Sequence, residues 1–406
     1  MKKIQIGLIG FGVVGSGFYE ILQKEKRRKD IFPYEIKKIA IKNIDKPRTA
    51  PAHLFTANYH DIINDPEITV VIELIDDANC AYRLIKSALE HKKHVISANK
   101  KMLSEHIKEL HLLATQHRCS LLYEAAVAGS IPILRNLENY YSGGYISTIF
   151  GIINGSTNYI LSEMQDRHID YKEALAKAQG LGFAESDPTL DVSGADAQSK
   201  LQLLAFHAFG TYISKKDIPT IGIAHLKQTD LAFAQTQNAV IKLLASCNYD
   251  VKKQKHELSV LPTLLPKEHR LAKIEGAFNG ILVGQDEIGF QLFEGAGAGS
   301  LATGSAVYTD LKALERQYQY TTLNKTQAQP LTEKKYQWYI RGPLTELPAI
   351  KKHFGISFLK VDKQHFCGII SCANSHALAL TQQGGFAVLR FLNPQTTKYP
   401  IFANDE

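Results

Sequence analysis

Apolar residues near the start of the chain alternate between short strand-like runs and longer helical spacings. The run at residues 4–9 predicts a strand, and a helix through Leu22 follows it after a glycine-rich turn. Further strands are predicted at 36–41, 70–74, 94–97 and 120–123, and helices at 80–90 and 104–117. Strands that alternate with helices in this way predict an α/β domain with a doubly wound parallel sheet of the Rossmann type, here over residues 1–133.

The pattern changes after residue 133. Residues 134–294 mix strands such as 145–153 with helices such as 171–179, which predicts a second domain of the α+β class. A polar stretch at 320–334 is typical of a linker. Beyond it we predict strands at 336–340, 356–361, 366–372 and 386–392, and helices at 344–353 and 375–382. Their βαββαβ order is typical of a small ferredoxin-like module, here residues 335–406.

Composition narrows the class of protein. A chain of 406 residues is long enough for two or three domains. Hydrophobic residues make up 45% and charged residues 21%, as in ordinary globular proteins, and no apolar run approaches the roughly 18 residues of a membrane span. Glycines interrupt the apolar N-terminal run, so we interpret it as a retained strand and turn and not as a signal peptide. We therefore expect a cytoplasmic protein without a membrane partner.

Charge and cysteine usage exclude two further classes of site. The net charge of +7 is modest, and the dense basic cluster at 24–29 is typical of a solvated helix end. Because the sequence has no basic stripe interleaved with aromatic residues, it does not favour a nucleic-acid partner. The five cysteines are spaced neither as zinc ligands nor as a disulfide framework, so we expect reduced thiols.

The first candidate site is the glycine-rich turn after the first strand. Its residues are Gly10, Phe11, Gly12, Val13, Val14 and Gly15. With a strand before it and a helix after it, this spacing is the dinucleotide-binding fingerprint. The first glycine permits the tight turn, the second lets the backbone approach a pyrophosphate, and the third lets the helix lie close to the strand. We therefore expect NAD or NADP, with its phosphates at the helix N-terminus.

The end of the second predicted strand bears on the choice of cofactor. NAD enzymes often carry an acidic residue there for the ribose hydroxyls, whereas this chain continues with Lys42 and Asn43. Lys42, together with Arg48, would suit the 2′-phosphate of NADP. Two solvated loop cations would give the same sequence, so both interpretations stay open.

The second candidate site is the stretch from Gly180 to Lys200. Its ionisable residues include Glu185, Asp191, Asp196 and Lys200. A helix is predicted to start after Ser193 and Gly194, which places Asp196 and Lys200 one turn apart on one face. A lysine beside carboxylates near an apolar helix could exchange a proton, and spare acids could hold a cationic substrate group such as that of an amino acid. The alternative is an ordinary surface pair.

Several motifs give the chain a resemblance to a known family. They are the fingerprint, Ser97-Ala98-Asn99-Lys100, Tyr123 to Gly129, Gly155 to Tyr159, LGFAESDPTLDVSGADAQSK, Phe278-Asn279 and Gly295 to Gly299. In this order, from about residue 1 to 311, the chain resembles homoserine dehydrogenase. The resemblance implies NAD(P)-dependent interconversion of L-aspartate 4-semialdehyde and L-homoserine, in threonine and methionine biosynthesis. It also implies that 134–294 is the substrate and dimerisation domain of a homodimer or dimer of dimers, and that 295–319 returns to the first domain.

The resemblance also implies residue roles. Lys200 would exchange a proton with the reacting oxygen, Asp196 would be its companion, and Lys100 would lie between nicotinamide and substrate. Glu185 and Asp191 would hold the amino end of the substrate. Ser97, Asn99 and Gly297 would contact the cofactor. The alternatives are a surface lysine at a helix start for Lys100 and a flexible hinge for Gly297.

A structural sodium ion is a further implication of the resemblance. Glu124 would bind it, together with the backbone carbonyls of Val127, Gly129 and Ile131. Oxygen ligands suit such a hard cation. A glutamate that only caps a turn would look the same in the sequence.

Other features depart from the family pattern or leave it open. Asp76 and Asp77 stand where the family usually has a glycine pair, and two acids pointing into a nucleotide crevice would repel phosphate. No aspartate kinase is expected in front of the fingerprint, and the tail resembles a shortened ACT domain, which would bind an amino-acid effector. The alternatives are a dehydrogenase of another amino-acid semialdehyde and an inactive cofactor-binding regulator.

Overall fold

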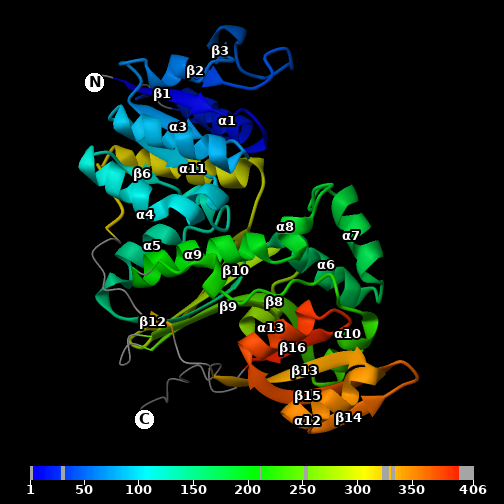
Figure 1. The fold of residues 1–406 in the computed structure, drawn as a ribbon. Helices are drawn as coiled ribbons and strands as arrows, with labels where there is room; N and C mark the ends of the chain where they lie inside the picture. Colours follow the sequence, from blue (N-terminus) through cyan, green and yellow to red (C-terminus); the bar gives the residue numbers. More distant parts are fainter. Residues whose placement is uncertain are drawn as a thin grey trace, which may run out of the picture. The chain divides into compact units, whose positions relative to one another are not determined.

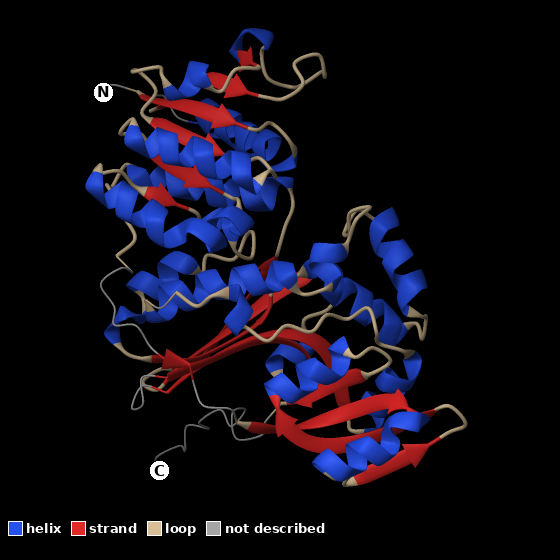
Figure 2. Cartoon of the chain, in the orientation of Figure 1, coloured by secondary structure: helices blue, strands red, loops and turns tan. Residues whose placement is uncertain are grey.

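The computed structural model describes residues 3–28, 33–210, 212–250, 255–321, 329–330 and 334–392. The chain divides into two compact units, and each crosses between distant parts of the sequence. The first unit comprises Met1–Ser142, Gln202–Tyr212 and Gly295–Thr326, and the second comprises Gly143–Leu201, Ile213–Glu294 and Gln327–Glu406. Each unit contains one β-sheet with helices packed against it (Figures 1 and 2).

The sheet of the first unit has six parallel strands in the order β3-β2-β1-β4-β5-β6. The strands are β1 (Ile4–Ile9), β2 (Tyr34–Ala40), β3 (Phe55–Thr56), β4 (Val70–Glu73), β5 (His94–Ser97) and β6 (Leu121–Leu122). The helices are α1 (Val13–Arg28), α2 (His60–Ile63), α3 (Ala78–Glu90), α4 (Lys100–Gln116), α5 (Leu134–Asn139) and α11 (Ser300–Leu314). The chain leaves β1 and β4 in opposite directions along the sheet, so right-handed crossovers place α1 and α3 on opposite faces (Figure 1). This is the predicted doubly wound sheet, with its switch point between β1 and β4.

Helix α11 packs against α1 although almost 300 residues separate their starts. Two glycines make the close approach possible. A Cβ at Gly17 would lie 2.1 Å from the carbonyl oxygen of Ser300, and one at Gly304 would lie 2.6 Å from the backbone nitrogen of Phe18. The chain therefore returns to the first unit after it has built much of the second.

The second unit is built on a larger sheet in the order β11-β10-β7-β8-β9-β16-β13-β15-β14, with β12 also pairing with β9. Its first strands are β7 (Ile146–Ile152), β8 (Ala239–Asp250), β9 (Lys255–Pro266), β10 (Phe278–Gln285) and β11 (Gly289–Ala296). Its helices before the tail are α6 (Gly155–Asp166), α7 (Tyr171–Gly180), α8 (Thr189–Val192), α9 (Ala195–Phe209) and α10 (Gln228–Thr236). The last residues of α9 are grouped with the first unit.

The tail has the βαββαβ order that the sequence predicts. Its elements are β13 (Lys335–Pro343), α12 (Leu347–Phe354), β14 (Phe358–Val361), β15 (His365–Ala373), α13 (Asn374–Gln382) and β16 (Ala387–Phe391), and the two-residue β12 (Gln329–Pro330) precedes them. The strand order β16-β13-β15-β14 is that of a ferredoxin-like unit. The sheet of this unit continues into the rest of the second unit, because β16 pairs with β9, with Arg390 opposite Thr263. Most of the predicted linker lies outside the described residues.

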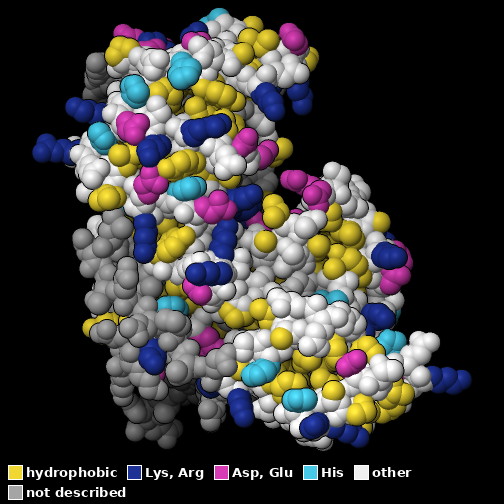
Figure 3. Space-filling model, viewed as in Figure 1, with side chains coloured by type: hydrophobic (Ala, Val, Ile, Leu, Met, Phe, Trp, Pro, Cys, Tyr) yellow, Lys and Arg dark blue, Asp and Glu magenta, His cyan; other side chains and the backbone are white. Residues whose placement is uncertain are grey.

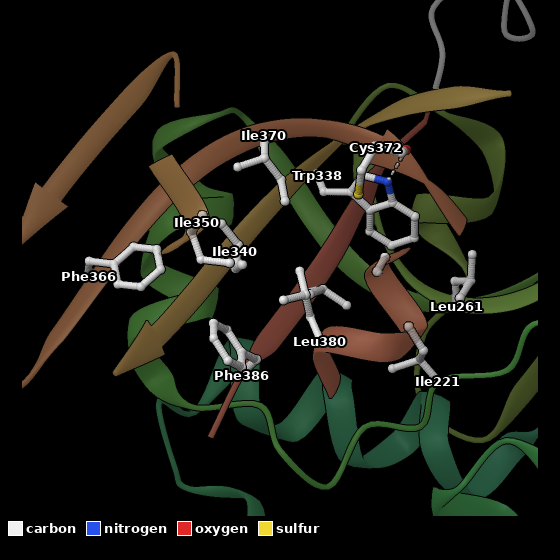
Figure 4. Close-up of a cluster of buried hydrophobic side chains, with 12 residues drawn as sticks. Ile221, Leu261, Trp338, Ile340, Ile350, Phe366, Ile370, Cys372, Leu380 and Phe386 are labelled. Atoms are coloured by element: carbon white, nitrogen blue, oxygen red, sulfur yellow. Dashed lines mark hydrogen bonds between the residues drawn. The ribbon is translucent and has the colours of Figure 1, made fainter. Parts of the chain in front are cut away.

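A buried cluster joins the tail to the rest of the second unit. Ile221 and Leu261 pack in one hydrophobic core with Trp338 and Leu380 of the tail (Figure 4). The indole N–H of Trp338 donates to the carbonyl oxygen of Cys372 at 3.1 Å. One sheet and one hydrophobic core therefore extend through both parts of residues 134–406. The division of these residues into two domains with a linker stays a prediction.

The surface charges, the cysteines and the helices can be compared with what the composition predicts. Lys and Arg are interspersed with Asp and Glu over the face shown in Figure 3. All five cysteines lie in the described ranges as free thiols. Within those ranges, no helix combines the length and the apolar character needed to cross a membrane.

Candidate active site

The fingerprint turn of the first unit has the backbone geometry that its glycines predict. Gly10 has a φ of 97°, and a Cβ there would lie 2.5 Å from the carbonyl oxygen of Leu74. A Cβ at Gly15 would lie 2.5 Å from the carbonyl oxygen of Gly10, whereas Gly12 faces open space. Helix α1 begins at Val13, so the open side of the turn meets a helix N-terminus that can hold an anion.

Lys42 and Arg48, the two residues proposed to bind the 2′-phosphate of NADP, differ in exposure and in contacts. Lys42 is exposed just beyond β2. Arg48 is half-buried, and its guanidinium lies 5.5 Å from the ring centre of Phe55. Phe55 in turn makes an edge contact with Phe11 of the fingerprint at 5.5 Å. The ring of Phe55 thus links Arg48 indirectly to the fingerprint.

The loops after β4 and β5 are joined by a buried carboxyl that sequence reasoning missed. Glu73 is completely buried, and its Oε2 accepts from Ser97 Oγ at 2.6 Å. Burial raises the pKa of Glu73 to about 7. Its position at the end of a strand in the fingerprint sheet was the signal that could have found it. Ser97 and Asn99, which were predicted to contact the cofactor, both make hydrogen bonds within these loops. Lys100 is half-buried and is the first residue of α4.

The two acids that depart from the family pattern are both exposed. Asp77 is the N-cap of α3, because its Oδ1 accepts from the N–H of Cys80 at 2.9 Å. Asp76 raises the pKa of Glu73 by its charge, although burial is the larger cause. Asp77 therefore has a structural role as a helix cap.

The second unit brings three predicted site residues into one network. Lys200 and Asp196 are both buried, and the distance from Nζ to Oδ2 is 2.8 Å. Lys200 Nζ also donates to the carbonyl oxygen of Ile153 at 2.8 Å. Asn154 Nδ2 donates to Asp196 Oδ2 at 2.9 Å and to Asp191 Oδ1 at 2.7 Å. Burial excludes the alternative of an ordinary surface pair.

Asn154 and Ser156 are members of this network that the sequence analysis did not single out. Asn154 follows β7 and caps α6 through the N–H of Thr157, at 2.8 Å. Ser156 Oγ lies 3.0 Å from Asp191 Oδ2 and 2.6 Å from the carbonyl oxygen of Phe183. An Asn at a strand-to-helix junction was a signal for the cap, but only the tertiary structure shows that its amide bridges two carboxylates.

Glu185 is placed apart from that network. It lies exposed on the loop between α7 and α8, where its carbonyl oxygen accepts from Gln179 Nε2 at 3.0 Å. Large apolar side chains are exposed around the same loop, among them Leu181, Phe183 and Leu190. The described contacts do not bring the side chain of Glu185 to Asp191.

The predicted sodium ligands lie in the first unit. Glu124 Oε1 accepts from the N–H of Leu134 at 2.7 Å, and Oε2 accepts from the N–H of Arg135 at 3.1 Å. The carboxylate therefore caps the start of α5 and pairs with the Arg135 side chain at 3.3 Å. A capping role was the alternative to sodium binding for Glu124. Gly297 lies against the same turn, since a Cβ at Gly129 would be 2.7 Å from its carbonyl oxygen.

Two family models match successive parts of the chain. The family model for homoserine dehydrogenase matches residues 132–311, and that for its NAD binding domain matches residues 10–124. The homoserine dehydrogenase of Synechocystis sp. is 37% identical over 373 residues, which cover 87% of this chain and 86% of the relative. That of Bacillus subtilis is 35% identical over 381 residues, which cover 89% and 88%.

Solved structures extend the similarity to the whole fold. The homoserine dehydrogenase of Thiobacillus denitrificans matches with a TM-score of 0.84 at 32% identity, over 97% of this chain and 99% of that chain. The S. aureus enzyme at pH 8.5 matches with a TM-score of 0.75 at 31% identity, over 97% and 100%. The chain therefore belongs to the homoserine dehydrogenase family, and it is an oxidoreductase with an NAD-binding domain.

Proposed function

We propose that the chain interconverts L-aspartate 4-semialdehyde and L-homoserine with a nicotinamide cofactor. The observation that carries this proposal is the buried pair of Lys200 and Asp196, bridged to Asp191 by Asn154. A positioned ammonium can give a proton to an aldehyde oxygen as negative charge develops there, and can take it back in the reverse direction. The carboxylate of Asp191 carries the charge needed to hold an amino group.

Each residue of the network has a separate role in this proposal. A bound nicotinamide cofactor supplies or accepts the hydride. Lys200 exchanges the proton, and Asp196 keeps its ammonium in place. Asn154 fixes the distance between the two carboxylates, since each hydrogen of its amide is donated to one of them. Lys100 and Glu185 are proposed from the family resemblance, as a second cation near the nicotinamide and an acid for the substrate's amino end.

Arg48 supports NADP as the preferred cofactor. Its guanidinium rests on Phe55, which contacts Phe11 of the fingerprint, and a guanidinium matches phosphate geometry well. Assembly as a homodimer or dimer of dimers, a cytoplasmic location and an ACT-like effector role of the tail stay predictions.

We also keep the structural sodium ion as a prediction for Glu124, Val127, Gly129 and Ile131. The test is thermal unfolding in sodium chloride and in tetramethylammonium chloride at equal ionic strength. A bound ion that favours the folded state raises the midpoint in sodium. Equal midpoints would mean that Glu124 only caps α5 and pairs with Arg135.

A steady-state assay of the purified chain tests the proposed function. Homoserine should be oxidised with NADP, and with NAD at lower efficiency. Other hydroxy amino acids in the same assay measure the alternative of a different semialdehyde. Cofactor binding without turnover of any of these substrates would identify the chain as the inactive regulator.

A further inference from the structure

Glu73 is the last residue of β4, at the carboxyl end of the first unit's sheet. Its partners in the neighbouring strands are Ile9 of β1 and Ser97 of β5. This is the switch point of the doubly wound sheet, outside which dinucleotides bind. A fully buried carboxyl is costly at any position unless hydrogen bonds compensate it, so its contacts indicate what it is for.

The two oxygens of Glu73 are hydrogen-bonded to two different loops. Oε1 accepts from the backbone N–H of Ile75 at 2.8 Å, and Oε2 accepts from Ser97 Oγ at 2.6 Å. Asn99 closes a ring of bonds, because its N–H donates to Ser97 Oγ at 3.1 Å and its Nδ2 donates to the carbonyl oxygen of Ile75 at 2.9 Å. One buried side chain therefore ties the loop after β4 to the loop after β5.

Each of these loops leads to a part of the proposed site. The carbonyl oxygen of Leu74 would lie 2.5 Å from a Cβ at Gly10, so the first loop rests directly on the fingerprint turn. In the second loop, Asn99 caps α4 by accepting from the N–H of Met102 at 3.0 Å, and Lys100 opens that helix. A shift of either loop would displace the turn or the lysine.

We propose that Glu73 is a positioning residue that fixes the fingerprint turn and Lys100 relative to each other, so that cofactor affinity and turnover both depend on its carboxyl group. The effect on turnover rests on the proposed function, through Lys100. The effect on cofactor affinity rests only on the NAD-binding domain.

The charge state of Glu73 gives this role a dependence on pH. Loss of hydration raises its pKa to about 7, the charge of Asp76 adds to the rise, and hydrogen bonds from Ser97 and Ile75 oppose it. Ile9 and Ser97, its partners on the adjoining strands, carry no charge. Above pH 7 the carboxyl is ionised, which places a negative charge where an anionic dinucleotide binds. Cofactor affinity should therefore fall as pH rises through about 7.

The experiment measures dissociation constants of NADPH and NADH by fluorescence between pH 6 and 8.5, with homoserine turnover measured in parallel. At pH 6, where the carboxyl is protonated, Glu73→Ala removes both bonds and should weaken cofactor binding roughly tenfold and lower kcat. Glu73→Gln keeps an acceptor for Ile75 and a polar group for Ser97, so at pH 6 it should bind within about threefold of the wild type. It cannot ionise and should lose the decline in affinity above pH 7.

A control and a second variant keep the test decisive. Glu90→Ala removes an exposed glutamate at the end of α3 and should leave affinity unchanged. If Glu73→Ala does not fold, Glu73→Asp shortens the side chain so that it cannot keep both bonds, and it should weaken binding by a smaller factor. Wild-type affinity in Glu73→Ala, or in Glu73→Asp where Glu73→Ala does not fold, or a pH decline retained in Glu73→Gln, would overturn the proposal. Glu73-dependent binding without homoserine turnover would instead overturn the proposed function.

Discussion

Lys200 is the residue on which the proposed chemistry depends most directly. Lys200→Ala should abolish turnover and leave cofactor binding nearly intact, because the fingerprint belongs to the other unit. Loss of a positioned proton-transfer group costs on the order of a hundredfold to ten-thousandfold in rate. The measurements are kcat with homoserine and the dissociation constant of the cofactor.

The matched control for Lys200 is Lys177→Ala on α7 of the same unit. Lys177 is more exposed, and its ammonium lies 3.3 Å from a carboxylate oxygen of Glu173, as in an ordinary surface ion pair. Such a change should alter the free energy of unfolding by less than about 0.5 kcal/mol and leave kcat unchanged. A Lys200→Ala enzyme with more than about a tenth of wild-type turnover would contradict the assignment, because that loss is far below the expected range.

Arg48 and Lys42 separate the two interpretations of cofactor preference. Arg48→Ala should lower kcat/KM for NADP more than for NAD, because the aromatic contact holds its guanidinium near the fingerprint. Lys42→Glu should change the ratio less, since Lys42 is exposed beyond β2. If instead Lys42→Glu changes the ratio strongly and Arg48→Ala does not, the 2′-phosphate is bound at the strand end.

Among the side-chain contacts of the candidate site, the sequence predicted the one in which a single helix supplies both partners. Asp196 and Lys200 are four residues apart on α9, so helix geometry alone places them together. Glu73 and Ser97 meet because β4 and β5 pair in the sheet, and Asn154 reaches Asp191 because α6 and α8 pack together. Those contacts depend on tertiary structure, which residue spacing does not contain.

At the scale of elements, the sequence predicted the alternation of strands and helices in the first unit and the order of elements in the tail. The predicted strand at 94–97 and the βαββαβ order of the tail are observed. Strand β3 has only two residues, and helix α2 makes a single turn, so neither is long enough to show its own period. Their omission mattered, since β3 carries Phe55, which supports Arg48.

A short segment connects the core shared with the tail to the turn that carries Asp191 and Asp196. Ile221 packs with Trp338, and its N–H donates to the carbonyl oxygen of Val260 at 2.9 Å. The N–H of Ile223 donates to the carbonyl oxygen of Val192, at the end of α8, also at 2.9 Å. Gly222, between them, lies so close that a Cβ there would be 2.1 Å from the same oxygen of Val192.

Gly222→Ala should therefore lower kcat. The added methyl group must push against the backbone between Asp191 and Asp196, and overpacking of this kind typically costs about 1–3 kcal/mol. Gly180→Ala is the control, because a Cβ at Gly180 has no neighbour within 4 Å. The measurement is kcat together with the thermal midpoint. Equal kcat in the two variants would show that the segment does not hold the acids.

At the scale of the whole molecule, the predicted linker and C-terminal module raise the question of whether a chain ending at Gln329 would stay active. The contacts of the second unit argue against this. Asp230 of α10 is completely buried and makes two hydrogen bonds to Arg341 of β13, at 2.8 and 2.9 Å. Removal of the tail would leave that carboxylate buried without its cation, at a cost of about 3–5 kcal/mol. It would also uncover Leu261.

The tail should instead unfold together with the rest of the second unit. Trp338 is the only tryptophan of the chain, and it is completely buried in the shared core, so its fluorescence reports on that core alone. In urea, the shift of its emission should coincide with the loss of homoserine turnover, because β16 and β9 belong to one sheet. Arg341→Met, which breaks the buried pair, should move both transitions to lower urea by the same amount. An emission shift at a urea concentration that leaves turnover intact would show that the tail is an independent module, and the chain ending at Gln329 should then be active.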